Sequence, residues 1–242
     1  MQAHDIEEKS PADMVTAADR EAELILSEGL LDLLPGSKVL GEEACSARPT
    51  PIEELKNEAR LWVVDPVDGT ANYVAGIPCF AVMVARLDFG ETVASWILDP
   101  VTDSLVAAER SAGAVLDGDP LCTDPSPRAF GEMRGAVITT FLPIAMRSDL
   151  ERRAARLGSV VPGLRCAGHE YPAIARGDQH FSLFWRTLPW DHAPGALMLT
   201  EAGGKVARPA GSAYHPLDGR FGLIAAQNPD IWEAAAAGLF RD

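Results

Sequence analysis

The chain has 242 residues, of which 47% are hydrophobic and 23% charged, a composition typical of a soluble globular protein with a large core. Its formal net charge of -14 excludes a nucleic-acid polymer and an anionic membrane as expected partners, because both bind basic patches. Small anionic substrates remain possible if metal ions supply positive charge locally. No apolar run approaches the ~18 residues of a membrane span, so we expect a cytoplasmic protein.

The first half of the sequence predicts a helix followed by an antiparallel sheet. The helix runs from Thr16 to Leu34 and ends at a Pro-Gly pair, and Thr16 and Asp19 have the spacing of a capping box. Short apolar runs predict strands at 39–40, 61–64, 79–87, 92–98 and 104–108. The last three of these strands are expected to form an antiparallel meander.

The second half alternates predicted strands with predicted helices, which indicates an α/β arrangement. Strands are expected at 135–141, 180–185, near 206 and at 222–226. Helices are expected at 144–157, 170–176, 191–202 and 229–239. Two prolines at 125–127 predict a boundary, so we expect an α+β subdomain over 1–126 and an α/β subdomain over 127–242, and an α/β class for the whole chain.

Four cysteines are scattered along the sequence without any Cys-x-x-Cys spacing: Cys45, Cys79, Cys122 and Cys166. This pattern indicates neither a zinc knuckle nor a disulfide framework. We expect reduced thiols.

The stretch 61–73 is the most informative part of the sequence. A buried strand delivers Asp65 and Asp68 into a turn that contains a proline and Gly69. Because proline fixes φ and glycine tolerates a positive φ, both carboxylates and the carbonyl of Val67 can converge on one point. Such all-oxygen surroundings suit Mg²⁺. The same residues also suit an ordinary surface turn, so both interpretations remain open for this stretch alone.

Three further acids have structural explanations of their own. Asp19 can complete a capping box. Glu42 follows a short strand in a Gly-Glu-Glu sequence, which is usually a solvated corner. Asp191 stands at a predicted helix start, where a carboxylate caps the helix and where amide dipoles also favour a bound phosphate.

All of these signals occur in one chain, and together they form a pattern. In order they are Val-Thr-Ala-Ala-Asp (15–19), Gly-Glu-Glu (41–43), Asp-Pro-Val-Asp-Gly-Thr-Ala-Asn (65–72), Trp-Asp (190–191) and Glu-Ala-Gly-Gly (201–204). From about Lys9 to its end, the sequence resembles the inositol monophosphatase superfamily of metal-dependent, lithium-sensitive phosphatases. The resemblance implies a layered αβαβα sandwich of the inositol monophosphatase/fructose-bisphosphatase type and a homodimer.

The resemblance also implies roles for the matching residues. A first Mg²⁺ would be held by Glu42, Asp65 and the Val67 carbonyl, and a second by Asp65, Asp68 and Asp191. Glu42 would help to place a third ion and counts among the catalytic residues. Thr70, oriented by Asp19, would polarise the attacking water. Phosphate and substrate would contact Asp68, Gly69, Thr70, Ala167 and Asp191.

The implied activity is Mg²⁺-dependent hydrolysis of a small, inositol monophosphate-like phosphate ester. The reacting group is anionic and such esters hydrolyse very slowly, so positioning and charge neutralisation must supply most of the catalysis. Two metals about 4 Å apart activate the water and stabilise the leaving oxygen. Bound ions would also remove the repulsion among the four carboxylates and so stabilise the fold.

Substrate choice is where the sequence departs from the inositol-specific pattern. Phe184 stands where inositol phosphatases carry a glutamate, and residues 165–171 replace the family's Gly-Ser/Thr-Ala. His169 and His180 are candidate substrate contacts. The alternatives within the superfamily are a histidinol-phosphate phosphatase, an adenosine 3′,5′-bisphosphate nucleotidase and a sugar bisphosphatase. The alternative outside enzymes is a catalytically silent metal-binding scaffold.

Two smaller departures concern helices. Pro194 stands where the family commonly has alanine, a change that a first helical turn tolerates. The family's amino-terminal helix is expected to be missing or shortened, because the Val-Thr-Ala-Ala-Asp motif lies near the start of the sequence.

Overall fold

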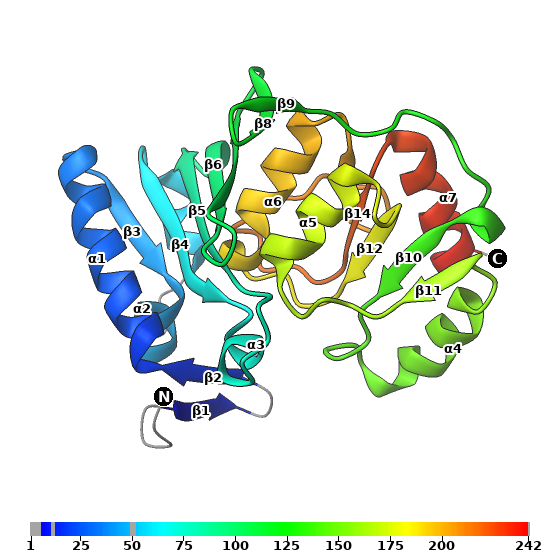
Figure 1. The fold of residues 1–242 in the computed structure, drawn as a ribbon, viewed down its shortest axis with the longest axis horizontal. Helices are drawn as coiled ribbons and strands as arrows, with labels where there is room; N and C mark the ends of the chain where they lie inside the picture. Colours follow the sequence, from blue (N-terminus) through cyan, green and yellow to red (C-terminus); the bar gives the residue numbers. More distant parts are fainter. Residues whose placement is uncertain (1–5, 11–12, 49–51, 242) are drawn as a thin grey trace.

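The computed structural model describes residues 6–10, 13–48 and 52–241, and Figure 1 shows the arrangement of their helices and strands. The larger of the two main sheets has seven strands in chain order. They are β3 (Lys38–Gly41), β4 (Leu61–Asp68), β5 (Ala81–Asp88), β6 (Glu91–Asp99), β7 (Ser104–Glu109), β8 (Gly113–Leu116) and β9 (Asp119–Leu121). Only the β3–β4 pair is parallel, so the rest of this sheet is the predicted antiparallel meander.

The second sheet has five strands in the order β11-β10-β12-β14-β13. They are β10 (Arg134–Val137), β11 (Ser159–Val161), β12 (Phe181–Phe184), β13 (Lys205–Ala207) and β14 (Leu223–Ala226). The pairs β10–β11 and β10–β12 are parallel, and the other two pairs are antiparallel. A separate hairpin, β1 (Ile6–Ser10) with β2 (Asp13–Thr16), precedes the first helix.

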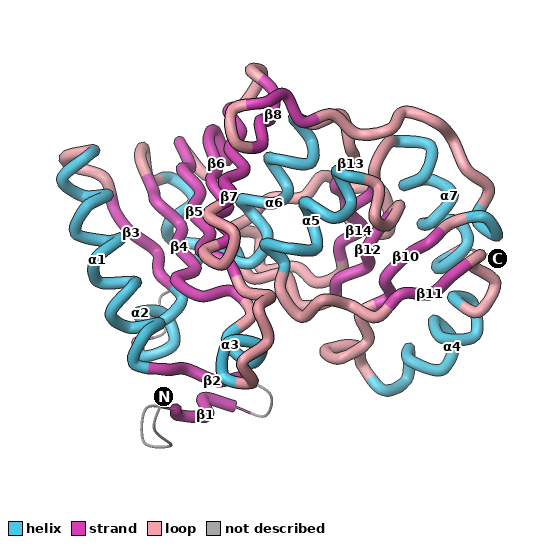
Figure 2. Tube along the Cα trace, viewed as in Figure 1, coloured by secondary structure: helices cyan, strands magenta, loops and turns pink. Residues whose placement is uncertain are grey.

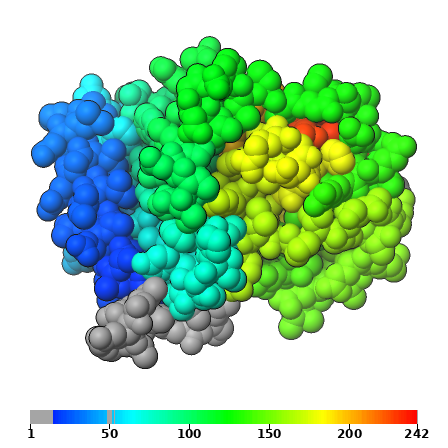
Figure 3. Space-filling model, in the orientation of Figure 1, coloured from blue at the N-terminus to red at the C-terminus, as the bar shows by residue number. Residues whose placement is uncertain are grey.

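Helices and sheets alternate in five layers (Figures 1 and 2). The outer layer on one side is α1 (Ala17–Leu33), which contacts β3 and β4. Between the sheets lie α5 (Ala167–Arg176) and α6 (Pro189–Glu201), which contact strands of both. The outer layer on the other side is α4 (Ile144–Ala154) with α7 (Pro229–Phe240). This confirms the predicted layered α/β fold, and Figure 3 shows α1 to β4 at one end of the molecule, in blue and cyan.

The core between the two sheets is built around the α5–α6 pair. Tyr171, Ile174 and Met198 are fully buried there. A Cβ added at Gly195 would collide with the ring of Tyr171. The absence of a side chain at this one position of α6 therefore allows the two helices to approach each other. Their close packing fixes where the first turn of each helix lies.

The predicted helices and most predicted strands are confirmed to within a few residues. The capping box between Thr16 and Asp19 is present at the start of α1. Several short elements were not predicted: the hairpins β1–β2 and β8–β9, the strand β11, the helices α2 (Glu42–Ala47) and α3 (Thr70–Val74), and the 3-10 helices η2 (Ile52–Asn57) and η3 (Phe130–Glu132). The strand predicted over 135–141 is shorter in the structure: β10 ends at Val137, and residues 138–143 are not part of any strand.

Two details of α6 correct the sequence analysis. The helix begins at Pro189, not Asp191, and its N-cap is Leu188, which makes no side-chain capping bond. Asp191 therefore lies inside the first turn of the helix and is not its N-cap residue. Pro194 falls beyond the first turn, inside the helix, where its missing N–H removes one helical hydrogen bond.

The two sheets change over between β9 and β10, close to the predicted boundary at 126. Because α5 and α6 contact both sheets, the division into subdomains 1–126 and 127–242 stays a prediction. The described residues before α1 are strands and not a helix. In the described ranges, no helix is both long and apolar enough to cross a bilayer.

Candidate metal and phosphate site

The site is built on the turn that ends β4. Asp65 is 1% exposed, and its Oδ1 accepts a hydrogen bond from the amide of Val67 at 3.1 Å. Gly69 follows with φ +87°, and a Cβ at this position would lie 3.0 Å from the carbonyl oxygen of Cys79. Only glycine meets both conditions without strain. The predicted turn, with its positive-φ glycine, is therefore confirmed.

Thr70 begins the short helix α3 (Thr70–Val74) and faces a buried acid from α1. Its Oγ1 lies 3.1 Å from Asp19 Oδ1 and 3.0 Å from the carbonyl oxygen of Val67. Asp19 Oδ2 accepts the amide of Thr16 at 2.8 Å. Asp19 thus serves as a capping residue and as the partner of Thr70 at the same time.

Glu42 is positioned by a contact that the sequence analysis missed. Glu23, 7% exposed on α1, accepts the amides of Glu43 at 2.7 Å and Ala44 at 2.8 Å, which caps α2. A Cβ on Gly41 would collide with this Glu23 carboxylate, so the glycine of Gly-Glu-Glu is required for the close approach. The only sequence signal for Glu23 was an acid on the inward face of a predicted helix.

Three of the four predicted carboxylates meet in space. One oxygen each from Glu42, Asp65 and Asp191 lies within 4.8 Å of the others, although the residues come from α2, β4 and α6. Asp65 is buried, and the other two are half-buried. The resemblance alone had predicted this grouping.

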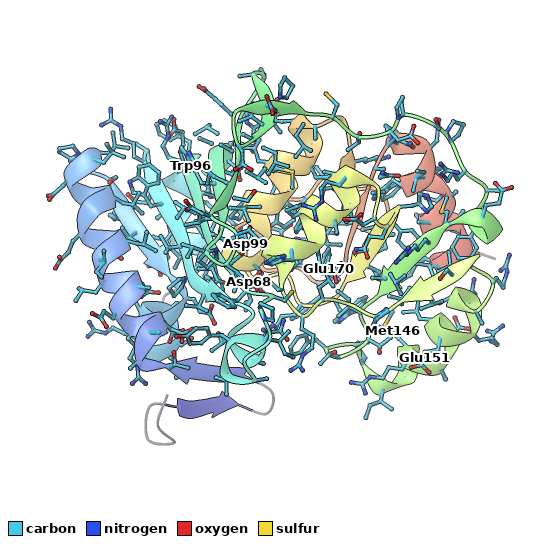
Figure 4. The ribbon with its side chains drawn as sticks, in the orientation of Figure 1. Asp68, Trp96, Asp99, Met146, Glu151 and Glu170 are labelled. Carbon is cyan, nitrogen blue, oxygen red and sulfur yellow. The ribbon has the colours of Figure 1, made fainter. Side chains whose placement is uncertain are left out.

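Asp68 lines the same cavity but is held differently. Its Oδ2 accepts the amide of Gly168 at 2.6 Å and lies 3.2 Å from Cys166 Sγ, both at the start of α5. In Figure 4, Asp68 is labelled between the seven-stranded sheet and α5, the helix that carries Glu170. Ala167, predicted to bind phosphate, also lines the cavity, and its amide hydrogen-bonds the Asp68 carboxylate.

Crowding raises the pKa values of the central acids. Burial raises the pKa of Asp65 well above its usual range, and the charges of Glu42, Asp68 and Asp191 raise it further. Burial raises the pKa of Asp68 to about 6, against the lowering effect of its hydrogen bonds to α5. A divalent cation would relieve this repulsion, and carboxylate oxygens, together with water, are ligands that Mg²⁺ prefers. The residues present therefore fit the implied metal.

These acids open into a cavity of about 180 Å³. Its lining includes every predicted metal, phosphate and catalytic residue except Asp19, which hydrogen-bonds to Thr70. The lining also includes residues for which no role was predicted, among them Thr140, Phe141, Arg165, Trp185 and Arg186. The guanidinium of Arg186 lies 4.0 Å from the ring centre of Phe141.

Phe184 forms part of the cavity wall, at the place where inositol phosphatases carry a glutamate. Its ring stacks on Tyr171 at 5.4 Å and meets His192 edge-on at 4.8 Å. The tyrosine hydroxyl and His192 Nδ1 are 3.0 Å apart. At position 184 the cavity lining is therefore aromatic and offers no carboxylate to a polyol.

Both candidate histidines lie outside the cavity lining. His180 Nδ1 accepts the amide of Arg134 at 2.7 Å, which gives it a structural role beside β10. His169 Nε2 lies 3.2 Å from the carbonyl oxygen of Phe80, and His169 is not among the residues that line the cavity. Neither is placed to contact a substrate bound at the carboxylates.

Fold and site together define a class: a five-layered α/β protein with a carboxylate-lined cavity between its sheets. The model of the inositol monophosphatase family matches residues 2–242, and the chain belongs to this family. It is 38% identical over 206 residues to an inositol-1-monophosphatase of Rhizobium meliloti, covering 81% of this chain and 72% of the relative. It is 31% identical to the Nus factor SuhB of Vibrio cholerae, covering 92% of this chain and 80% of that protein.

A solved structure gives the same answer for the fold. The extragenic suppressor protein SuhB of Bartonella henselae superposes with a TM-score of 0.83 at 29% identity, covering 98% of this chain and 88% of the other. The expected superfamily and the layered architecture are thereby confirmed.

Proposed function

We propose that this protein is a Mg²⁺-dependent phosphomonoesterase that hydrolyses a small phosphate ester. The observation that carries the proposal is the meeting of Glu42, Asp65 and Asp191 within 4.8 Å, beside the Thr70–Asp19 pair. Membership of the inositol monophosphatase family supports it, as does the name of the Rhizobium relative.

The residues that would hold two or three Mg²⁺ ions are Glu42, Asp65, Asp68, Asp191 and the carbonyl of Val67. When bound, such ions supply positive charge to the phosphate, lower the pKa of the attacking water and stabilise the leaving oxygen. The half-buried positions of Glu42 and Asp191 leave the cluster accessible from the cavity. The raised pKa of Asp65 means that protons compete with metal for this site.

Thr70 and Asp19 would orient the attacking water. With Asp19 Oδ1 as acceptor for its hydroxyl hydrogen, Thr70 Oγ1 keeps lone pairs that accept a hydrogen bond from a water in the cavity. Asp19 is 1% exposed and held by Thr16, so it positions the hydroxyl without itself meeting the substrate. The amides of Gly69 and Thr70 would bind phosphate oxygens.

Within this class we propose an inositol monophosphate-like ester as the first candidate substrate. A second candidate, adenosine 3′,5′-bisphosphate, is favoured by the cavity lining, which includes Arg165 and Arg186 as well as the aromatic rings of Phe141 and Trp185. Guanidinium groups bind a second phosphate, and aromatic faces stack on a base. We also propose a homodimer, by family resemblance alone.

The test is phosphate release across a panel of esters, with Asp65→Asn as the critical variant. The panel comprises inositol monophosphate, histidinol phosphate, adenosine 3′,5′-bisphosphate and fructose 1,6-bisphosphate. We expect Mg²⁺-dependent release from at least one ester and its loss in the variant, with an unchanged far-ultraviolet circular dichroism spectrum. Undiminished release by Asp65→Asn refutes the assignment, and metal binding without hydrolysis of any ester favours the silent scaffold.

A further inference from the structure

A second group of metal-ligand atoms lies beside the carboxylate site and has a different chemistry. Cys79, Cys166 and His169 each offer one atom, two sulfurs and a ring nitrogen, within 4.8 Å of one another. Cys79 precedes β5, while Cys166 is the N-cap of α5 and His169 lies in its first turn. The last two form a Cys-x-x-His spacing that brings both side chains to the same end of one helix.

The three side chains combine burial with access. Cys166 is 3% exposed, whereas Cys79 and His169 are half-buried, so an ion can reach the group from solvent. All four cysteines are free thiols, so Cys79 and Cys166 are not joined by a disulfide.

The contacts of His169 leave one ring nitrogen available for a metal ion. Its Nε2 lies 3.2 Å from the carbonyl oxygen of Phe80 and 3.9 Å from Asp99 Oδ2. Histidines that bind metals commonly donate their other ring N–H to such a carbonyl or carboxylate, so Nδ1 is the nitrogen that would bind the ion. The carboxylate of Asp68, 3.2 Å from Cys166 Sγ, adds a second negative charge beside the group.

We propose that Cys79, Cys166 and His169 form a binding site for a thiophilic divalent cation, with Zn²⁺ as the best fit. Zinc prefers sulfur and imidazole nitrogen at about 2.0–2.3 Å in a tetrahedron, which places ligand atoms roughly 3.5 Å apart. The three ligand atoms lie within 4.8 Å of one another, so small side-chain rotations would be needed to bring them to this spacing. Water would complete the tetrahedron.

Binding forms two metal–sulfur bonds and one metal–nitrogen bond and releases both thiol protons to solvent, so no oxidant is consumed. Soft thiolates separate this site from the all-oxygen carboxylate site, which takes hard cations. The two sites touch through Asp68, because Cys166 Sγ would no longer donate to its carboxylate once the sulfur binds metal.

The proposal is tested by titrating the full chain with Co²⁺, after reduction by a phosphine and in excess Mg²⁺. A cobalt–thiolate bond gives a near-ultraviolet charge-transfer band, and an all-oxygen site gives none. The test therefore reads this site alone and is independent of phosphate release. We expect the wild type to show the band at one equivalent and to lose it when Zn²⁺ is added.

Variants decide which residues hold the ion. Cys79→Ser should lose at least half of the band and bind cobalt more weakly, while Cys122→Ser, at an exposed cysteine outside the group, should match the wild type. If Cys79→Ser fails to fold, His169→Asn keeps both thiols and should still weaken cobalt binding. No band in a wild-type chain with titratable thiols, or an equal band in Cys79→Ser and Cys122→Ser, overturns the proposal.

Discussion

Thr70 shows how one hydroxyl can serve both structure and chemistry. It lies between the carboxylate of Asp19 and the carbonyl of Val67, at 3.1 and 3.0 Å. A hydroxyl has one hydrogen, so it donates to one of these acceptors and keeps lone pairs for another partner. Since Asp19 is already fixed by the capping box, the position of Thr70 Oγ1 is fixed as well.

We therefore expect Thr70→Ala to lower kcat by about 100-fold or more, the usual size of a lost proton-handling group. Thr70→Ser keeps the hydroxyl and should retain most of the activity. KM should change little in both variants, because the proposed role concerns the attacking water and not the ester. Steady-state kinetics at saturating Mg²⁺ measure the difference, and equal kcat values for the alanine and serine variants would exclude this role.

His192 is the buried residue that links pH to stability most directly. It is 2% exposed, and burial lowers its pKa from 6.5 to about 3. Between pH 6.5 and 3 the unfolded chain binds a proton at this position that the folded chain does not bind. The free energy of unfolding must then fall as the pH drops through this window.

His192→Gln should remove this pH-dependent loss. A shift of one pKa unit corresponds to about 1.4 kcal/mol, so the stability gap between wild type and variant should change by about 2–3 kcal/mol from pH 7 to pH 4.5. Urea unfolding of both proteins at the two pH values measures it. Because the raised pKa values of Asp65 and Asp68 act in the opposite direction in both proteins, the comparison isolates His192. A gap that does not change with pH would show that His192 is not held neutral.

Residue-level prediction from the sequence succeeded where the chemistry is local. The positive φ of Gly69 and the capping box follow from a few neighbouring residues, so pattern alone was sufficient. The position of Asp68 could not be predicted, because its partner Gly168 is 100 residues away. The same holds for Glu23, whose acceptor role depends on α2 lying against α1.

At the level of elements, the α5–α6 pair determines how the site is assembled. It places Asp191 in the first turn of one helix and the Asp68-binding amides in the first turn of the other. The pair can approach only because Gly195 leaves room for the ring of Tyr171. Small residues at such a crossing are therefore part of the site's construction.

Two glycine substitutions test this claim as a matched pair. Gly195→Ala should destabilise the fold by about 1–3 kcal/mol, because the added methyl group has no space. Gly29→Ala, at an exposed position on α1 with nothing within 4 Å, should stabilise it by about 0.5–1 kcal/mol. Denaturant unfolding of the two variants gives both values. An unchanged free energy of unfolding in Gly195→Ala would contradict the claim, because it would mean that α5 and α6 can move apart without loss of stability.

The elements missed from sequence share a physical cause. β11 has three residues at a sheet edge, none of them buried, so no apolar pattern marks it. The start of α6 was placed two residues late, because Asp191 resembles a capping residue, whereas Pro189 occupies the first helical position, where proline is common. The long, strongly patterned helices and the meander were predicted because their apolar spacing is repeated many times.

For the molecule as a whole, the site exists only where layers meet. Glu42 lies on α2, which contacts α1 and the seven-stranded sheet. Asp65 lies on strand β4 of that sheet, and Asp191 lies on α6, in the helical layer between the sheets. Spacing in the sequence cannot show that such residues meet, and only the family resemblance predicted it. The folded chain gathers negative charge at this junction, and bound cations would neutralise it.

The most direct test of this claim is a crystal of the full chain soaked in Mn²⁺, with anomalous scattering used to locate the ion. Mn²⁺ accepts the same oxygen ligands as Mg²⁺ and scatters anomalously. We predict at least one peak within bonding distance of a carboxylate oxygen of Asp65 and of one from Glu42 or Asp191, and its loss in Asp65→Asn. A wild-type crystal with no peak at these three residues would contradict the account.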